Sequence, residues 1–327
     1  MILAIETSCD DTCAAVVDAA GVIHSNVISS QSVHDVYGGV VPEVASRHHI
    51  ALINLVVADA LHQAAVTLDD IDRVAVTQGP GLVGALLVGV STAKGIAASR
   101  GLELVAVDHL QGHVAANFLE PHPLEPPFVC LIASGGHSFL ARVDDHSSFT
   151  VLGGTLDDAA GEAFDKGARL LGLPYPGGPH LERLAAEGDA AAFEFPLAHG
   201  VTGLDMSFAG LKTSLLYAVR DLGDEAPGRY ADLAASYQHA IVEQLARRVE
   251  RALTETGLDR LAIGGGVAAN GPLRERLASV ATTVKVPDRA LCTDNAAMIA
   301  SAARFLEPLA SDELLGLDVY ATGQRDL

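Results

Sequence analysis

Short apolar runs separated by polar turns occupy the first thirty residues of the chain. Residues 2–5 form one apolar run, residues 6–12 form a polar turn, and residues 13–17 form a second apolar run. This pattern predicts a β-hairpin, to which residues 22–29 can add a third strand. The hydroxyl groups and backbone amides of such a turn can hold phosphate oxygens. An ordinary hairpin with a solvated tip has the same pattern, so both interpretations stay open.

Longer elements follow this hairpin. Residues 42–65 carry apolar side chains at helical spacing, which predicts a long helix. An apolar strand is expected at residues 71–77, followed by a glycine-containing turn at 78–84 and a helix to about residue 98. A strand, a glycine turn and a helix start together favour anion binding, because free backbone amides and the helix dipole point at the turn.

The same order of elements returns in the second half of the chain. A proline-dense linker at 121–127 precedes a strand at 128–133, a polar glycine turn at 134–138 and a returning strand at 139–143. A later strand at 258–263 leads into a second glycine-rich turn and a helix. This repeat predicts an α/β protein with two actin-like domains facing a central cleft, the ribonuclease-H-like plan of sugar kinases and Hsp70-type ATPases. Ligands are expected in that cleft.

We expect the first actin-like domain at residues 1–107 and the second at residues 108–327. The second would carry an insertion at about 152–237, and the C-terminal tail can pack back on the first domain. Runs without clean periodicity, such as those of the insertion, usually line a site or a partner surface. Within it, Asp165 could bind the hydroxyl groups of a ribose, and the glycine pair at 177–178 would let a base or sugar approach the backbone.

Two histidines four residues apart follow the apolar run at 104–107. His109 and His113 fall on one face of the predicted helix, close enough to bind one metal ion. Imidazole suits zinc or iron, but two ligands do not complete a site, and Asp294 is our candidate for an oxygen ligand. The alternative is that both histidines only cap and solvate the helix start. In the first polar turn, Asp10 and Asp11 could hold a metal-bound water or accept a proton.

Composition and charge narrow the class of protein. The 327 residues are 49% hydrophobic, enough for a large core and for more than one ordinary domain. The apolar runs are too short for a membrane span, and the first residues read as a strand rather than a secretion signal. Four cysteines without a Cys-x-x-Cys pair fit a reducing cytoplasm. The net charge of −20, from 41 acidic and 21 basic residues, argues against nucleic-acid binding by bulk electrostatics but leaves room for a local basic patch.

Nine motifs give the sequence a family resemblance. They occupy residues 5–12, 38–43, 79–82, 109–113, 134–137, 162–166, 175–179, 264–270 and 292–295. In content and order these motifs resemble the tRNA adenosine threonylcarbamoyltransferase family, once described as O-sialoglycoprotein endopeptidases, and more closely its bacterial branch. The resemblance covers essentially the whole length of the chain.

The resemblance implies a set of site residues. The family's metal ligands fall on His109, His113 and Asp294. Its nucleotide and substrate contacts fall on Ile132, Ala133, Ser134, Gly135, Gly136, Asp165, Gly178 and Asn270. A further acidic contact falls on Glu182, where this chain has the longer carboxylate. Gln111 stands where the family more often has Glu, which removes one negative charge beside the metal and matters little if this residue is not a ligand.

The resemblance also implies a reaction, cofactors and partners. A threonylcarbamoyl group would pass from threonylcarbamoyl-AMP to the exocyclic amine of the adenosine 3′ of the anticodon, in tRNAs that read codons beginning with A, and AMP would leave. One divalent metal, iron or zinc, and threonylcarbamoyl-AMP or ATP are the expected ligands. Besides tRNA, the expected partners are a smaller paralogous actin-like subunit (TsaB-type) and a P-loop ATPase subunit (TsaE-type). The paralogue would dock on an apolar helical face such as residues 42–65, which reads equally well as ordinary core.

Two other functions fit parts of the sequence. A catalytically inactive scaffold of the same fold is one alternative, but the intact histidine pair and Asp294 argue against it, since a decayed site has little reason to keep them. A metallopeptidase would also use two histidines at this spacing. That chemistry needs a Glu directly after the first histidine, and Leu110 occupies the position. For removal of the amine proton, Asp10 and Asp11 are the candidates.

Overall fold

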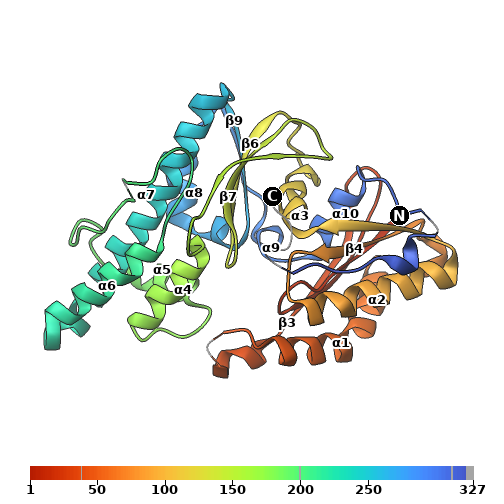
Figure 1. The fold of residues 1–327 in the computed structure, drawn as a ribbon, viewed down its shortest axis with the longest axis horizontal. Helices are drawn as coiled ribbons and strands as arrows, with labels where there is room; N and C mark the ends of the chain where they lie inside the picture. The colour runs from red at the N-terminus through yellow and green to blue at the C-terminus, as the bar shows by residue number, and fades with distance from the viewer. Residues whose placement is uncertain (38, 199, 311, 322–327) are drawn as a thin grey trace. The chain divides into compact units, whose positions relative to one another are not determined.

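The computed structural model describes residues 1–37, 39–198, 200–310 and 312–321 (Figure 1). Gly38, the first residue of the motif at 38–43, lies outside the described residues. The chain divides into two compact units. The first unit comprises residues 1–126, 145–148 and 293–327, and the second comprises residues 127–144 and 149–292.

The first unit is built on a five-stranded mixed sheet. Its strands are β1 (Ile2–Glu6), β2 (Asp11–Val17), β3 (Ile23–Ser30), β4 (Arg73–Gly79) and β5 (Glu103–Asp108), in the spatial order β3-β2-β1-β4-β5. The first three strands are antiparallel neighbours, whereas β4 and β5 run parallel to β1. The predicted hairpin and its third strand are confirmed.

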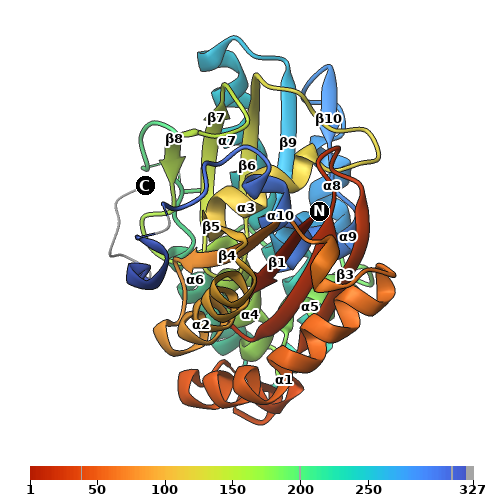
Figure 2. The same ribbon diagram turned by 90° about the vertical axis from the view of Figure 1, so that its right-hand side faces the viewer.

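Helices cover both faces of this sheet (Figure 2). They are α1 (Pro42–Gln63), α2 (Val83–Arg100), α3 (His109–Ala115) and α10 (Ala296–Ala303). On one face α1 and α2 pack together and against the strands, and on the other α10 packs against β1, β2 and α3. Because both faces are covered, all five residues of β1 are buried, which explains its unbroken apolar run. The predicted long helix and the strand, turn and helix that follow it are confirmed.

The second unit contains a sheet of the same topology. Its strands are β6 (Phe128–Ala133), β7 (Ser138–Val143), β8 (Thr150–Gly154), β9 (Arg260–Gly264) and β10 (Thr283–Lys285), in the order β10-β9-β6-β7-β8. Here too the first three strands are antiparallel neighbours, and the last two run parallel to the first. Each sheet therefore joins a three-stranded meander to two parallel strands. The predicted repeat is confirmed.

Most of the segment expected as an irregular insertion is helical. The helices of the second unit are α4 (Ala160–Leu170), α5 (Gly177–Ala185), α6 (Ala209–Leu222), α7 (Tyr230–Thr256), α8 (Gly271–Leu277) and α9 (Arg289–Cys292). Among the described residues of both units, short 3₁₀ turns lie at Ser32–Tyr37, Leu68–Asp70, Ala116–Phe118, Gly223–Arg229, Gly266–Ala269 and Leu314–Gly316. Buried side chains such as Phe164, Leu181 and Phe208 join the insertion to the core of the unit.

The two units differ from the predicted domains, which were divided after residue 107. Both α3 and α10 belong to the first unit, because α10 consists of buried small and apolar residues that pack on β1, β2 and α3. Two hydrogen bonds join the C-terminal segment to the rest of the first unit. Ser301 Oγ donates to Ala115 O at 2.7 Å, and Leu309 N donates to Leu104 O at 2.8 Å. Across the described ranges we find no helix with the length and apolar character of a membrane span.

Candidate functional site

Two histidines begin α3 directly after β5. The carboxylate of Asp108 caps this helix by accepting hydrogen bonds from the backbone N–H groups of Leu110 and Gln111, at 2.8 and 3.2 Å. His109 and His113 are both buried, and their ring centroids lie 4.7 Å apart. The predicted placement of both rings on one helix face is confirmed. The Gln111 side chain instead donates to the backbone of the segment 145–148, away from the rings.

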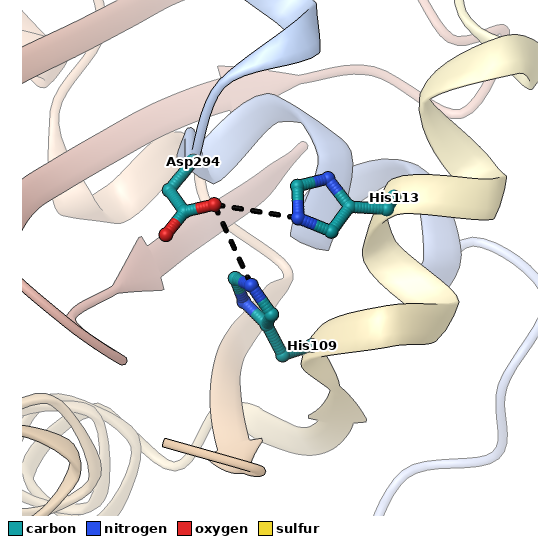
Figure 3. A group of neighbouring side chains, drawn as sticks. All are labelled: His109, His113 and Asp294. Atoms are coloured by element: carbon teal, nitrogen blue, oxygen red, sulfur yellow. Dashed lines mark ion pairs between the residues drawn. The ribbon is translucent and has the colours of Figure 1, made fainter. Parts of the chain in front are cut away.

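A carboxylate from the far end of the chain joins the two histidines (Figure 3). Asp294 precedes α10, and Asn295 caps that helix by accepting a hydrogen bond from the backbone N–H of Met298 at 3.0 Å. Asp294 Oδ1 lies 3.5 Å from His109 Nε2 and 3.3 Å from His113 Nε2. Two ligands on a tetrahedral ion with bonds of about 2.0–2.1 Å are themselves about 3.4 Å apart. These three side chains therefore have the spacing of a metal-binding group.

His113 is the least satisfied member of this group. Its side chain is 1% exposed, and neither ring nitrogen has a hydrogen bond to any part of the chain that the structure describes. The contact of Nε2 with Asp294 is an ion-pair distance without hydrogen-bond geometry. A buried polar atom without a partner is costly. A helix-capping role would leave both nitrogens unsatisfied, whereas metal binding would satisfy Nε2.

Glu6 is a partner of His109 that the sequence pattern did not reveal. It ends β1, is fully buried, and its Oε2 lies 3.0 Å from His109 Nδ1. Thr77 Oγ1 donates to the same oxygen at 2.5 Å. Because β1, β4 and β5 are parallel, their carboxyl ends meet at one edge of the sheet and bring these three residues together. A proton on Nδ1 that is donated to Glu6 leaves Nε2 free to bind a metal ion.

The charges of this group compensate one another. Burial alone would raise the pKa of Asp294, but His109 and His113 outweigh it and hold the pKa well below its usual range. Burial alone would lower the pKa of His109, but Asp294 and Glu6 raise it well above its usual range. The carboxylates of Asp294 and Glu6 thus favour a positive charge beside the two imidazole rings. A bound divalent cation would carry such a charge.

Asp11 lies at the start of β2 with an altered acidity. Its pKa is raised to about 7, mainly by burial and also by repulsion from Asp294, Asp10 and Glu6. A hydrogen bond with Ser30 lowers the pKa but does not cancel this rise. A carboxyl with a pKa near neutrality suits proton transfer. Asp10 precedes the strand, and its backbone oxygen accepts a hydrogen bond from the N–H of residue 31 at 3.2 Å.

In the second unit, the predicted glycine turn follows β6. Ile132 and Ala133 end this strand and are buried. Ser134 closes the turn, because its backbone N–H donates to the carbonyl of residue 137 at 2.7 Å. Gly135 and Gly136 are exposed, and a Cβ at either position would meet open space. The backbone of this turn is therefore accessible to a ligand.

The second glycine turn lies beside the first. Strand β9 pairs with β6 in parallel, so that Gly264 stands opposite Ile132. At Gly265 the backbone has φ +84°, and a Cβ would lie 2.4 Å from Ala133 O. Only glycine fits this close approach. The two glycine-rich motifs, far apart in the sequence, thus meet at one edge of the sheet.

Two further predicted residues meet at the start of α5. Asp165 on α4 accepts hydrogen bonds from the backbone N–H groups of Gly177, at 2.7 Å, and of Gly178. Burial outweighs these bonds and raises the pKa of the carboxyl. Asp165 therefore caps α5, a structural contact in addition to the expected ribose contact.

Glu182 and Asn270 form a hydrogen-bonded pair. Asn270 Nδ2 donates to Glu182 Oε2 at 3.1 Å and to Gln238 Oε1 at 2.9 Å. The other oxygen of Glu182 accepts from the N–H of Gly271 at 3.0 Å. Gln238, on α7, is 7% exposed and was not among the predicted site residues; an amide within a helical segment gives no signal of its contact in the sequence.

Known proteins resemble this chain over most of its length. A family model described as TsaD, tRNA N6-adenosine threonylcarbamoyltransferase, matches residues 21–301. A relative of that name from Clostridium perfringens (strain 13 / Type A) is 52% identical over 314 residues, which cover 93% of this chain and 92% of the relative. Another of the same name from Clostridium botulinum (strain 657 / Type Ba4) is 51% identical over 313 residues, with the same shares covered.

Solved structures confirm the fold class. The activator of the 2-hydroxyisocaproyl-CoA dehydratase from Clostridium difficile, with bound ADPNP, has a TM-score of 0.54 against this chain at 16% sequence identity. The match covers 96% of both chains. At this identity the likeness concerns the fold and not the chemistry.

Proposed function

Because the chain belongs to the TsaD family of tRNA N6-adenosine threonylcarbamoyltransferases, we propose that it carries out this transfer on the adenosine 3′ of the anticodon, in tRNAs that read codons beginning with A. The chain is a transferase that modifies tRNA. The observation that carries the proposal is the identity of about half of the residues over 93% of the chain. The proposed donor is threonylcarbamoyl-AMP.

The reaction joins an amine to a carbonyl carbon. The exocyclic nitrogen of adenosine forms a bond to the carbamoyl carbon, and the bond from that carbon to the phosphate oxygen breaks. AMP leaves with the electron pair, and the amine loses a proton. Catalysis therefore needs positioning of the two reactants and stabilisation of negative charge on the carbonyl oxygen and the departing phosphate.

The first unit is proposed to hold one divalent metal ion, iron or zinc, on His109, His113 and Asp294. Three observations support this: the ligand spacing, the unsatisfied nitrogens of His113 and the Glu6 carboxylate behind His109. When bound, the metal would supply Lewis acidity and a template for the substrate. Glu6 keeps the His109 ring in one orientation and its proton on Nδ1.

We propose that a carboxylate of the first polar turn, residues 6–12, removes the amine proton. Asp11 is the stronger candidate, because its pKa of about 7 lets it exist as a base at neutral pH and still hold a proton once it accepts one. Asp10 is the second candidate, on its place in the same turn.

The second unit is proposed to bind the nucleotide, as threonylcarbamoyl-AMP or ATP. The turn at Ser134, Gly135 and Gly136, which follows Ile132 and Ala133, offers an exposed backbone to phosphate oxygens. The remaining contacts are proposed at Asp165, Gly178, Glu182 and Asn270. The hydrogen bonds of Glu182 support this, because they fix its carboxylate and the Asn270 amide at the start of α8.

The first unit is proposed to bind a partner protein. Four apolar side chains of α1 and α2, which pack together, are 43–66% exposed: Ile50, Leu55, Val83 and Leu87. They support docking of the smaller paralogous actin-like subunit, since large exposed apolar side chains on two helices that pack together are typical of a protein interface. The predicted stripe at 42–65 is thus partly core, as at Val56, and partly surface. A P-loop ATPase subunit and a cytoplasmic location complete the proposal.

The test combines activity with metal content. The purified chain is mixed with its two proposed partners, ATP, threonine, bicarbonate and the enzyme that makes threonylcarbamoyl-AMP, and the modified nucleoside in tRNA is measured by mass spectrometry. We expect His109→Ala and Asp294→Ala to lose both the metal and the modified nucleoside, and His24→Ala, an exposed histidine of the same unit, to keep both. Unchanged metal content in both site variants would overturn the metal site. Absence of any product with the unchanged chain would overturn the function.

A further inference from the structure

Negative charge is unevenly distributed between the two units. The first unit has 6 basic against 21 acidic residues, a formal charge of −15, whereas the second has 15 against 20, a formal charge of −5. Most of the overall charge of −20 therefore belongs to the first unit. A polyanion is repelled less by the second unit, and a local cluster of cations there has the greater effect.

The long helix α7 of the second unit (Figure 1) carries such a cluster. Arg247, Arg248 and Arg251 line one cavity of about 190 Å³, together with Leu197, Val201 and Gln244. We call it the arginine cavity. One water molecule occupies about 30 Å³ in the liquid, so a phosphate group fits in this space. The side chains of Arg247 and Arg251 are 51% and 48% exposed and can be reached from solvent.

The carboxylates near the arginine cavity neutralise it only in part. Arg247 Nε lies 3.4 Å from Glu243, but Arg276 holds the same carboxylate at 2.7 Å. Arg251 forms a closer pair with Glu255, at 2.6 Å. Among the residues described at the cavity wall, none is acidic.

Arg248 differs from its neighbours because it binds backbone instead of carboxylate. Its guanidinium donates to Val201 O at 2.9 Å and to Gly203 O at 3.1 Å. Burial lowers its pKa, and the charge of Arg251 lowers it further, although the nearby charge of Asp205 raises it in part. The arginines around the cavity thus repel one another, and an anion between them would relieve that repulsion.

We propose that the arginine cavity binds phosphate groups of the tRNA backbone. The guanidinium group matches phosphate through two parallel hydrogen bonds, and this cavity has three arginines and no lysine. The inference rests on the proposed function, which makes tRNA the substrate. It gives the chain a place where RNA can bind in spite of its overall charge.

The cavity acts on affinity rather than on the chemical step. Gln238, the partner of Asn270, lies nine residues before Arg247 on the same helix, which is about 14 Å along the axis and half a turn around it. The cavity is therefore remote from the residues proposed to bind the nucleotide. A phosphate contact there holds the body of the RNA and leaves the reacting groups unchanged.

The test uses the double variant R247Q/R251Q of the full chain, assembled with its two proposed partners. Arg248 stays in place, so the backbone at Val201 and Gly203 remains held. Dissociation constants for tRNA are measured at several salt concentrations. We expect about a ten-fold weaker affinity near 0.15 M salt. The slope of log Kd against log salt concentration should fall by about 1 to 2, because each lost phosphate contact lowers this slope by about 0.7 to 0.9. The KM for tRNA should rise, while kcat at saturating tRNA stays unchanged.

The matched control is R100Q/R220Q, which removes the same charge from two exposed, ion-paired arginines elsewhere. If both double variants change the affinity and the salt dependence equally, the effect is one of overall charge and the proposal is overturned. Unchanged tRNA affinity together with weaker assembly of the partner proteins would identify a protein contact instead and would also overturn it. A wild-type complex that neither binds nor modifies tRNA would refute the proposed function itself.

Discussion

Replacing Glu6 with Gln tests how the first unit prepares His109 for a metal ion. Glu6 is fully buried, and its Oε2 takes hydrogen bonds from His109 Nδ1, at 3.0 Å, and from Thr77 Oγ1. Gln has nearly the same shape, but it removes the charge behind the imidazole and replaces one acceptor oxygen with a donor. His109 then loses a charge-assisted hydrogen bond and the fixed proton on Nδ1.

The expected loss is about 10- to 100-fold in metal affinity, the usual effect of removing such a partner of a metal-binding histidine. This corresponds to about 1.4 to 2.7 kcal/mol. The assay is competition between the metal-free protein and a chromophoric chelator, with circular dichroism to show that the variant is folded. Glu43→Gln is the control, because that carboxylate is 77% exposed and forms an ion pair with the equally exposed Arg47. An affinity equal to wild type in a folded Glu6→Gln chain would refute the reasoning.

Four further outcomes follow from the structure. His113→Ala should abolish transfer and metal binding with its helical circular dichroism retained; loss of most helical signal would favour the capping interpretation. Asp165→Ala should weaken adenine nucleotide binding by about 1 to 3 kcal/mol in calorimetry, because it leaves buried polar groups without a partner, and unchanged affinity would remove it from the site. The rate of transfer should rise with pH through about 7, since deprotonated Asp11 is the proposed base, and Asp11→Asn should remove that step from the kcat profile. The pair I50E/L55E should prevent assembly with the paralogous subunit in size-exclusion chromatography without lowering the melting temperature, because both side chains are about two-thirds exposed.

Local pattern alone predicted most strands of both sheets, but not β5, β8 or β10. Period-two and continuous apolar runs predicted β1 to β4, β6, β7 and β9, because a strand covered on both faces needs an apolar residue at nearly every position. The order of these elements predicted the repeat. The spacing of His109 and His113 placed both rings on one face, since residues four apart on a helix are neighbours whatever surrounds them.

The sequence could not reveal the contacts that join distant segments. Asp294 lies 3.3 Å from His113 although the two are 181 positions apart, and the sequence offered it as a candidate ligand without any local pattern that places it beside the histidines. The contact of Glu6 with His109 depends on the parallel pairing of β1, β4 and β5, which no local pattern contains.

The division of the chain was likewise decided by tertiary packing. A short helix such as α10, apolar on every side, specifies burial but not the surface that buries it. Only the assembled structure shows that it covers β1 and β2 and packs on α3. Hydrophobic burial has no direction, and so the sequence determined which residues are buried while the shape of the folded sheets determined what they are buried against.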